Sequence, residues 1–423
     1  MTRAALLLLP LLLAGCANSA SPPPGPAPDF DTAAMDALLS GAVERGDIIG
    51  VSALVFDEGK TVYRGNFGLR DRERGLPVTN DTVWRIYSMT KPITSALIMD
   101  LAEEGLVDLD APASDYIPQL AEMKVLDRQP GRAPALVDQE RPMTVKDLLL
   151  HRSGLAYGIF PGPVEAQYAQ AGLLEPDVDL ATKVERLADL PLLFQPGEMW
   201  RYSYSIDVLG RIAEVVTGER LDDLMEDRFF EPLGMEETSF RVQPDQAERF
   251  ASNYAQTPGG FVLQDDAQTS AFLDANAFQS GGGGLVGTID DYARFAQMML
   301  DGGTYGGTRI LEEETVAQMM SDQMEPNFTS VLPWIGGDTG TGFGYGGSVQ
   351  LSATPRQQLA AGRYPGQWGW SGAARTTFYV DPANDAFGII MLQFFSDADP
   401  EIHDYFQALA LEMTRDAPLE PAE

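Results

Sequence analysis

A serine and a lysine with spacing suited to catalysis occur in residues 86–94, which read IYSMTKPIT. Apolar residues recur at helical spacing after Lys91, so Ser88 is expected at or near the start of a helix. Residues three apart on a helix share a face, which brings the amine within hydrogen-bond reach of the hydroxyl. The lysine could then take the serine proton and activate a nucleophile. The same residues could equally be a capping serine and a surface lysine, and spacing alone leaves both interpretations open.

Other serine and metal mechanisms find little support in the composition. The only histidines are His151 and His403, the only cysteine is Cys16, and no Gly-x-Ser-x-Gly motif occurs. A Ser-His-Asp hydrolase of the α/β type therefore has no obvious place, and a zinc site lacks its three or four ligands. Lys91 is the best available base, and no metal or other cofactor is expected.

Three separated stretches carry a resemblance to a known family. Residues 88–91, Ser-Met-Thr-Lys, match the first motif of the serine β-lactamase and penicillin-binding-protein superfamily, and Tyr202 within residues 196–210 matches its catalytic tyrosine. Residues 370–372, Trp-Ser-Gly, match the third motif on a late strand. The chain resembles in particular the class C β-lactamase-like branch and its family VIII carboxylesterases.

Residues 143–155 and 281–300 are similar to further signatures of that family, and the resemblance covers about residues 31–415. It implies an acyl-enzyme formed on Ser88, with Lys91 and Tyr202 sharing the proton transfers. It also implies an oxyanion hole made by the backbone N–H groups of Ser88 and Ala373.

A base near neutral pH must be unprotonated, so a lowered pKa is expected for Lys91 and for Tyr202. The acidic chain opposes this, because a negative field holds protons on. We therefore expect a local cation such as Arg85 or Arg201 near the site.

The chain departs from the family pattern at two substrate-binding positions, which affects the expected substrate. Trp370 replaces the lysine of the third motif, and Tyr204 replaces the asparagine of the second. With Ser371 and Gly372 these residues are expected to contact the substrate. Losing a cation and an amide partner disfavours β-lactams and D-alanyl peptides more than a simple ester. The sequence predicts a carboxylesterase acting on short- to medium-chain acyl esters.

Two alternatives stay open at this point. One is a β-lactamase or D-alanyl-D-alanine carboxypeptidase, since Arg363 or Arg375 could supply the missing cation. The other is a non-catalytic binding lipoprotein of the cell envelope that keeps the fold. His151 is interpreted as a structural histidine that fixes a loop, and residues 281–284 as a tight glycine loop.

The strand and helix patterns predict an α/β (α+β) fold of the β-lactamase/transpeptidase type. Residues 48–68, 375–382 and 387–395 read as strands that pair into one antiparallel sheet, flanked by helices at about 31–44 and 400–415. An α/β lobe from about 31–85 and 290–415 would enclose a mostly helical lobe, about 86–289, with the active site at the junction. Within the helical lobe and its edge we expect helices at 144–150, 180–190, 206–216 and 289–300.

The N-terminus predicts export. An apolar run of about ten residues follows Arg3, which is too short to span a bilayer and suits a signal peptide at 1–16. Residues 13–16, Leu-Ala-Gly-Cys, resemble a bacterial lipobox, so Cys16 is expected to carry a lipid anchor. A proline-rich linker is expected at 17–30, and a C-terminal tail at 416–423. The expected location is the periplasm, with the anchor in a membrane; family analogy favours the outer membrane.

The net charge limits the partners. The chain carries 29 basic and 62 acidic residues, a formal net charge of −33. Such a field repels nucleic acid and anionic lipid headgroups. The expected partner is a small-molecule acyl ester or amide, while the oligomeric state is not predicted by the sequence.

Overall fold

The structure of the protein is a computed structural model. It describes residues 32–414 except 129–130, 132, 176–177, 275–278, 326–327, 331–334, 337–338 and 397–400. The expected signal peptide with Cys16, the linker at 17–30 and the tail at 416–423 lie outside the described residues.

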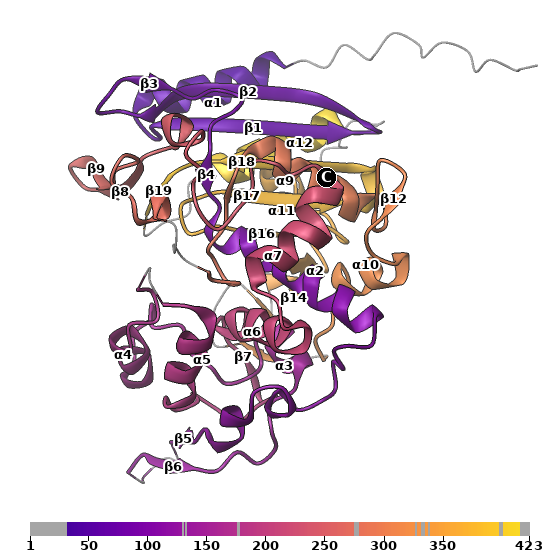
Figure 1. The fold of residues 1–423 in the computed structure, drawn as a ribbon. Coiled ribbons are helices and arrows are strands. Elements are labelled where there is room, and N and C mark those ends of the chain that lie inside the picture. The colour runs from indigo at the N-terminus through magenta and orange to yellow at the C-terminus, as the bar shows by residue number, and fades with distance from the viewer. Residues whose placement is uncertain are drawn as a thin grey trace, which may run out of the picture.

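An eight-stranded antiparallel sheet forms the centre of the fold, with strand order β14-β15-β16-β17-β18-β1-β2-β3 (Figure 1). The first strands of the chain pair with the last, and Leu54 of β1 lies opposite Ile389 of β18. This pairing confirms the predicted antiparallel sheet. The strands are β1 (Gly50–Asp57), β2 (Lys60–Asp71), β3 (Leu76–Pro77), β14 (Thr341–Phe343), β15 (Ser348–Gln350), β16 (Trp368–Ser371), β17 (Thr377–Asp381) and β18 (Ala386–Met391).

Helices cover both faces of this sheet, which explains why β1 is buried along its whole length. Successive side chains of a strand point to opposite faces. Ala53 and Val55 accordingly join a core cluster with helices α1 (Ala33–Arg45) and α12 (Ile402–Met413), whereas Leu54 joins the larger cluster on the other face. Helix α9 (Ile289–Leu300) packs on that second face, against β17 and β18.

The helices predicted at 144–150, 180–190 and 206–216 are present, and the first two pack against the third, α6 (Ser205–Thr217). This helix contacts α2 (Thr90–Glu103), α3 (Val145–Leu149) and α5 (Leu180–Ala188). Figure 1 shows α3, α5 and α6 on the side of α2 that faces away from β1 and β2. The remaining helices are α4 (Pro163–Gln170), α7 (Leu221–Met225), α8 (Glu231–Leu233), α10 (Glu313–Met319) and α11 (Pro355–Ala361).

Short strands also occur where the sequence predicts mostly helix. β8 (Asn253–Thr257) and β9 (Gly260–Asp265) form a hairpin, and β8 pairs in parallel with β19 (Phe394–Phe395) from near the other end of the chain. The other short strands are β4 (Trp84–Arg85), β5 (Val125–Asp127), β6 (Ala135–Val137), β7 (Met199–Trp200), β10 (Val286–Gly287), β11 (Thr304–Tyr305), β12 (Thr308–Arg309) and β13 (Thr329–Ser330).

The segment that carries Ser88 joins the sheet to the helical region. Strand β4 leads into a 3₁₀ turn at Tyr87–Met89, and α2 follows directly. Almost every side chain of α2 is buried, from Thr90 to Leu101, so this helix runs through the core and holds its first turn rigidly. Of the helices that the structure describes, none has the length and apolar character needed to cross a membrane.

Candidate active site

A large cleft of about 1240 Å³ lies where the first turn of α2 meets the edge of β16. Ser88, Tyr157 and Tyr202 line it from the helical region, and Trp370 lines it from β16. A cavity of this size accommodates an organic substrate with room for solvent. Of the residues expected at the site, Ser88, Tyr202, Trp370, Ser371, Gly372 and Ala373 line this cleft.

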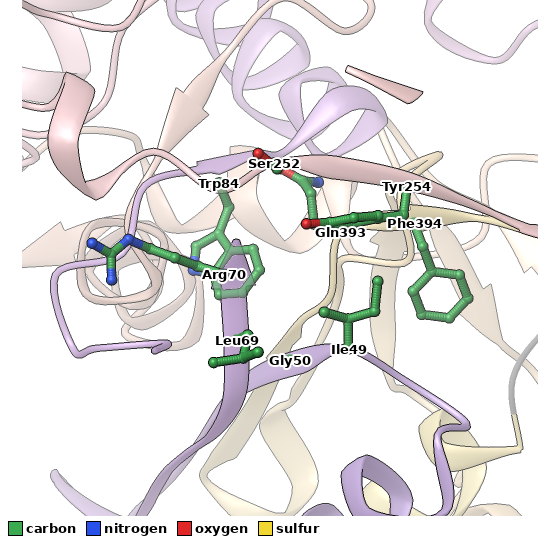
Figure 2. Close-up of a pocket in the computed structure, with 9 residues that line it drawn as sticks. All are labelled: Ile49, Gly50, Leu69, Arg70, Trp84, Ser252, Tyr254, Gln393 and Phe394. Atoms are coloured by element: carbon green, nitrogen blue, oxygen red, sulfur yellow. The ribbon is translucent and has the colours of Figure 1, made fainter. Parts of the chain in front are cut away.

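A second cavity is too small to compete as a substrate site. Figure 2 shows the nine residues around it, among them Trp84, Ser252 and Gln393, at the junction of β4, β8 and the ends of β1 and β2. Its volume of about 10 Å³ suits about one water molecule. We therefore place the candidate active site in the large cleft.

The first motif brings its two polar side chains together. Lys91 Nζ donates a hydrogen bond to Ser88 Oγ at 3.3 Å, one helical turn apart as the spacing predicts. Lys91 also donates to the carbonyl oxygen of Gly282. The serine is 9% exposed and the lysine 1% exposed, so the hydroxyl faces the cleft while the amine stays behind it.

Tyr202 lies across from this pair, on the segment that precedes α6. Lys91 Nζ is 4.6 Å from the centre of its ring. From the other side of the cleft, Trp370 Nε1 donates to Tyr202 Oη at 3.4 Å. The structure thus joins the lysine of the first motif, the tyrosine of the second and the tryptophan of the third in one connected group.

Tyr157 belongs to the same group, although no sequence motif includes it. Lys91 Nζ donates to Tyr157 Oη at 3.3 Å, the same distance as to Ser88. Its ring stacks on the ring of Tyr202, with centres 5.1 Å apart. Burial raises the pKa of the Tyr157 phenol, while the nearby Lys91 lowers it. The only sequence signal for Tyr157 is its place two residues after a family-like stretch.

The expected lowering of the Lys91 pKa is wrong. Burial does lower it, because desolvation penalises the ammonium, but Tyr157, Tyr202 and Asp207 raise it by more. The pKa of Lys91 lies above that of a free lysine, so the resting site holds an ammonium at neutral pH.

The two arginines that were expected to act on the lysine are each paired with a carboxylate. Arg85 is fully buried and forms an ion pair with Asp265 at 2.7 Å. Arg201 forms one with Glu165 at 2.5 Å. Each guanidinium is neutralised by its own carboxylate, so neither supplies the field that would deprotonate Lys91.

The strand that carries the third motif forms the opposite wall of the cleft. Ser371, Gly372 and Ala373 line it. A Cβ at Gly372 would lie 2.2 Å from Thr376 Oγ1 and 2.4 Å from the carbonyl oxygen of Ile86, so only glycine fits here. This close approach ties the segment of Ala373 to the residues just before Ser88, which is the arrangement that two oxyanion donors need.

Tyr204, in contrast, does not lie on the cleft wall. It is 2% exposed, and its ring stacks on Tyr157 with centres 4.6 Å apart and planes 6° apart. The structure therefore places it beneath the cleft, where it supports Tyr157. Arg363 and Arg375 do line the cleft. Arg363 pairs with Asp404 at 3.2 Å, and Arg375 donates to the carbonyl oxygen of Ser396.

His151 is buried behind Tyr202, with ring centres 4.9 Å apart. Its Nδ1 is 3.1 Å from Ser203 Oγ, and its backbone has a φ of 52°, a conformation uncommon for a residue with a side chain. Burial and the nearby Lys91 hold its pKa well below the usual histidine value, so the ring is neutral. These contacts agree with the structural role expected from the sequence.

No cluster of three or more His, Cys, Asp or Glu side chains suited to a metal occurs within the described part of the chain. The donor groups that face Ser88 are an amine, phenols and an indole, which suit proton transfer and hydrogen bonding.

Comparison with known proteins shows the family of this chain. The model of the Beta-lactamase family matches residues 35–412. The chain belongs to the beta-lactamase family. It is 35% identical to an uncharacterized protein of Mycobacterium tuberculosis, over 85% of this chain and 87% of that protein.

Two further relatives of this beta-lactamase-family chain carry names that describe an activity. It is 30% identical to Esterase EstB of Burkholderia gladioli, over 83% of this chain and 87% of that protein. The solved structure of EstCE1, a hydrolase with promiscuous acyltransferase activity, superposes with a TM-score of 0.73 at 25% identity, covering 88% of this chain and 97% of the other. The protein is a serine hydrolase with the β-lactamase fold.

Proposed function

We propose that the protein is a carboxylesterase that forms an acyl-enzyme on Ser88. The observation that carries the proposal is the hydrogen bond from the buried Lys91 amine to Ser88 Oγ, 3.3 Å long, at the wall of a large cleft. A hydroxyl held this way is within reach of a proton acceptor and of a substrate at once.

The reaction divides into two transfers with Ser88 as the acyl carrier. Ser88 Oγ bonds to the acyl carbon while the ester C–O bond breaks, and the serine proton ends on the released alcohol. Water then attacks the acyl-enzyme, the bond to Ser88 breaks, and a proton returns to the serine oxygen. Backbone N–H groups of Ser88 and Ala373 would stabilise the oxyanion in both steps, each contributing about 3 to 4 kcal/mol.

Lys91, Tyr157 and Tyr202 form the network through which these protons pass. One group of the network must be deprotonated before the network can accept the serine proton. The raised pKa of Lys91 keeps its amine protonated at neutral pH. We therefore expect the acylation rate to rise as the pH becomes alkaline. Trp370 fixes the Tyr202 hydroxyl from the substrate side.

The chemistry of the cleft supports an ester with an apolar acyl group of short to medium length. Ile159, Phe160, Leu174 and Phe272 contribute apolar surface to its wall, and Trp370 stands where the family has a cation. The apolar part of this wall accepts an uncharged ester more readily than a substrate whose carboxylate needs a partner. The relatives named as an esterase and a hydrolase support the same class of substrate.

Parallel assays test the substrate class. Purified protein should hydrolyse a p-nitrophenyl butyrate or hexanoate ester faster than nitrocefin, and Ser88→Ala should lose both activities. Faster turnover of nitrocefin by the wild type would favour a β-lactamase and overturn the esterase proposal. Wild-type protein that neither hydrolyses an ester nor reacts with a fluorophosphonate would favour a binding protein.

We also propose that the protein is exported and anchored through a lipid on Cys16. The support is the sequence alone: an apolar run of about ten residues, a lipobox and a proline-rich spacer. Mass spectrometry of the N-terminal peptide from the native host tests this proposal. A diacylglyceryl-modified cysteine as the first residue is expected, and a mature chain with unmodified Cys16 would refute it.

A further inference from the structure

A buried ion pair lies behind the candidate proton network. Lys183 of α5 donates to Asp207 Oδ1 of α6 at 3.0 Å, and the two side chains are 2% and 1% exposed. Ser280 Oγ donates to the same oxygen at 2.6 Å. The other carboxylate oxygen, Asp207 Oδ2, is buried and has no hydrogen-bond partner among the described residues.

The unpartnered oxygen faces Lys91 across a glycine. A Cβ built at Gly282 would lie 2.4 Å from Asp207 Oδ2 and 3.4 Å from Lys91 Nζ, so the two groups approach each other through the space that a side chain would fill. The carbonyl of the same glycine accepts a hydrogen bond from Lys91. Asp207 therefore acts on Lys91 through the protein interior, and neither Asp207 nor Lys183 lines the cleft.

A stabilising role is a weak explanation for this pair. Desolvation of two charges offsets most of their attraction, so buried ion pairs contribute little net stability compared with apolar residues of the same size. A carboxylate with one free oxygen aimed at a catalytic lysine does, however, change the free energy of that lysine's ammonium form.

We propose that Asp207 and Lys183 are positioning residues that set the protonation of Lys91, with Asp207 favouring its ammonium and Lys183 limiting that effect. The proposal rests on the proposed function, in which Lys91 belongs to the proton network of Ser88. Asp207 has the larger influence because its Oδ2 faces Lys91, whereas Lys183 is bonded to the far oxygen.

The other titratable groups that face Lys91 are the phenols of Tyr157 and Tyr202 and the imidazole of His151. The imidazole is neutral, because burial and Lys91 lower its pKa. Asp207 is therefore the carboxylate through which the charge beside Lys91 can be changed without altering the groups that face the substrate.

Charge removal gives predictions of opposite sign. Asp207→Asn leaves the Lys183 ammonium alone, disfavours the Lys91 ammonium, and should move the pH at which activity rises about 1 to 2 units toward acid. Lys183→Met leaves the carboxylate without its partner and should move this pH toward alkaline by a smaller amount, because the Lys183 ammonium lies farther from Lys91 than the Asp207 carboxylate does. The variant with both changes should show a smaller acid shift, because the nearer charge is the one that Asp207 carries.

The measurement is the rate of covalent labelling by an alkyl fluorophosphonate from pH 6 to 10, followed by intact mass. Circular dichroism at each pH shows where each variant is folded, and labelling rates are compared only within that pH range. Asp71→Asn is the control, since Asp71 is equally buried and paired, with Arg74, at the far end of β2. It should leave the pH dependence unchanged.

Each outcome can be assigned. Opposite shifts of the pH dependence in the two single variants support the proposal. If only one of them folds, an acid shift in Asp207→Asn or an alkaline shift in Lys183→Met supports it. If neither folds, an acid shift in the double variant supports it. Unchanged pH dependence in the folded variants, or shifts of the same sign in both single variants, would overturn it. If wild-type labelling persists in Ser88→Ala, the proposed function has failed instead.

Discussion

The side-chain nitrogen of Lys91 lies 3.3 Å from the hydroxyl oxygen of Ser88, and the lysine is almost completely removed from solvent. Both residues belong to the rigid start of a helix buried in the core. Their geometry is therefore fixed before any substrate arrives, which is what an activated nucleophile needs.

Removing the amine should abolish proton transfer while leaving the fold intact. We expect Lys91→Met to lower kcat/KM for a p-nitrophenyl ester by about 10²- to 10⁴-fold, the usual contribution of a general acid–base group. The thermal unfolding transition should stay cooperative. Retention of most of the activity in a folded Lys91→Met variant would show that this amine does not act on Ser88.

The two tyrosines that contact Lys91 should differ in their effects. Tyr202→Phe removes the hydroxyl that Trp370 binds on the ring beside Lys91 and should lower kcat by about 10²-fold or more. Tyr157→Phe keeps the stacked ring, removes one acceptor of the Lys91 ammonium, and should cost about tenfold or less. A larger loss in Tyr157→Phe than in Tyr202→Phe would exchange their roles.

Trp370 provides a test of substrate preference. Trp370→Lys restores the cation that the resemblance assigns to the third motif, so nitrocefin turnover should rise relative to ester turnover. Trp370→Phe is the matched control, because it removes only the Nε1 hydrogen bond to Tyr202, which contributes at most about 1 kcal/mol. If the ratio of nitrocefin turnover to ester turnover is the same in Trp370→Lys as in Trp370→Phe, residue 370 does not decide the substrate class.

His151 should make stability depend on pH. Its pKa is depressed in the folded state, so the unfolded chain binds a proton that the folded chain does not, and stability present above pH 6.5 is lost as the pH falls. Between pH 7.5 and 5.5 this loss is about 1.4 kcal/mol. Urea unfolding of His151→Gln should show a correspondingly smaller change between these two pH values. Loss of that pH dependence in His403→Gln instead would contradict the assignment.

Gly372 should be intolerant of any side chain. The Cβ of Gly372→Ala would collide with the backbone carbonyl of Ile86, and overpacking of this kind costs about 1 to 3 kcal/mol. We expect lower stability together with a large loss of activity, because the segment of Ala373 must shift away from Ser88. Gly259→Ala is the control, since its Cβ would meet only Thr257 Oγ1, at 3.8 Å. Equal activity of the two variants would argue against the close approach.

The features of the fold and of the site that could be predicted from the sequence are those encoded by local residue patterns. The pairing of Ser88 with Lys91 follows from helical spacing, and the joining of the first and last strands follows from their apolar pattern. The sequence does not predict the hairpin of β8 and β9, because its strands are short and carry no alternation of buried apolar and exposed polar residues; Val262 and Leu263 of β9 are both exposed.

The electrostatics of the site could not be predicted in the same way. The pKa of Lys91 depends on Tyr157 and Asp207, which reach it only through the folded chain. Arg85 was expected beside the site, but it pairs with Asp265, a residue far along the chain. Charge balance of this kind is a property of the packed interior, and residue spacing does not reveal which acid neutralises which base.

The most direct test is the intact mass of the protein mixed rapidly with a p-nitrophenyl ester, followed by peptide mapping of the adduct. We expect a mass increase equal to one acyl group, located on Ser88 and absent from Ser88→Ala. Ester turnover that continues in Ser88→Ala, or an adduct on another residue that supports turnover, would contradict it.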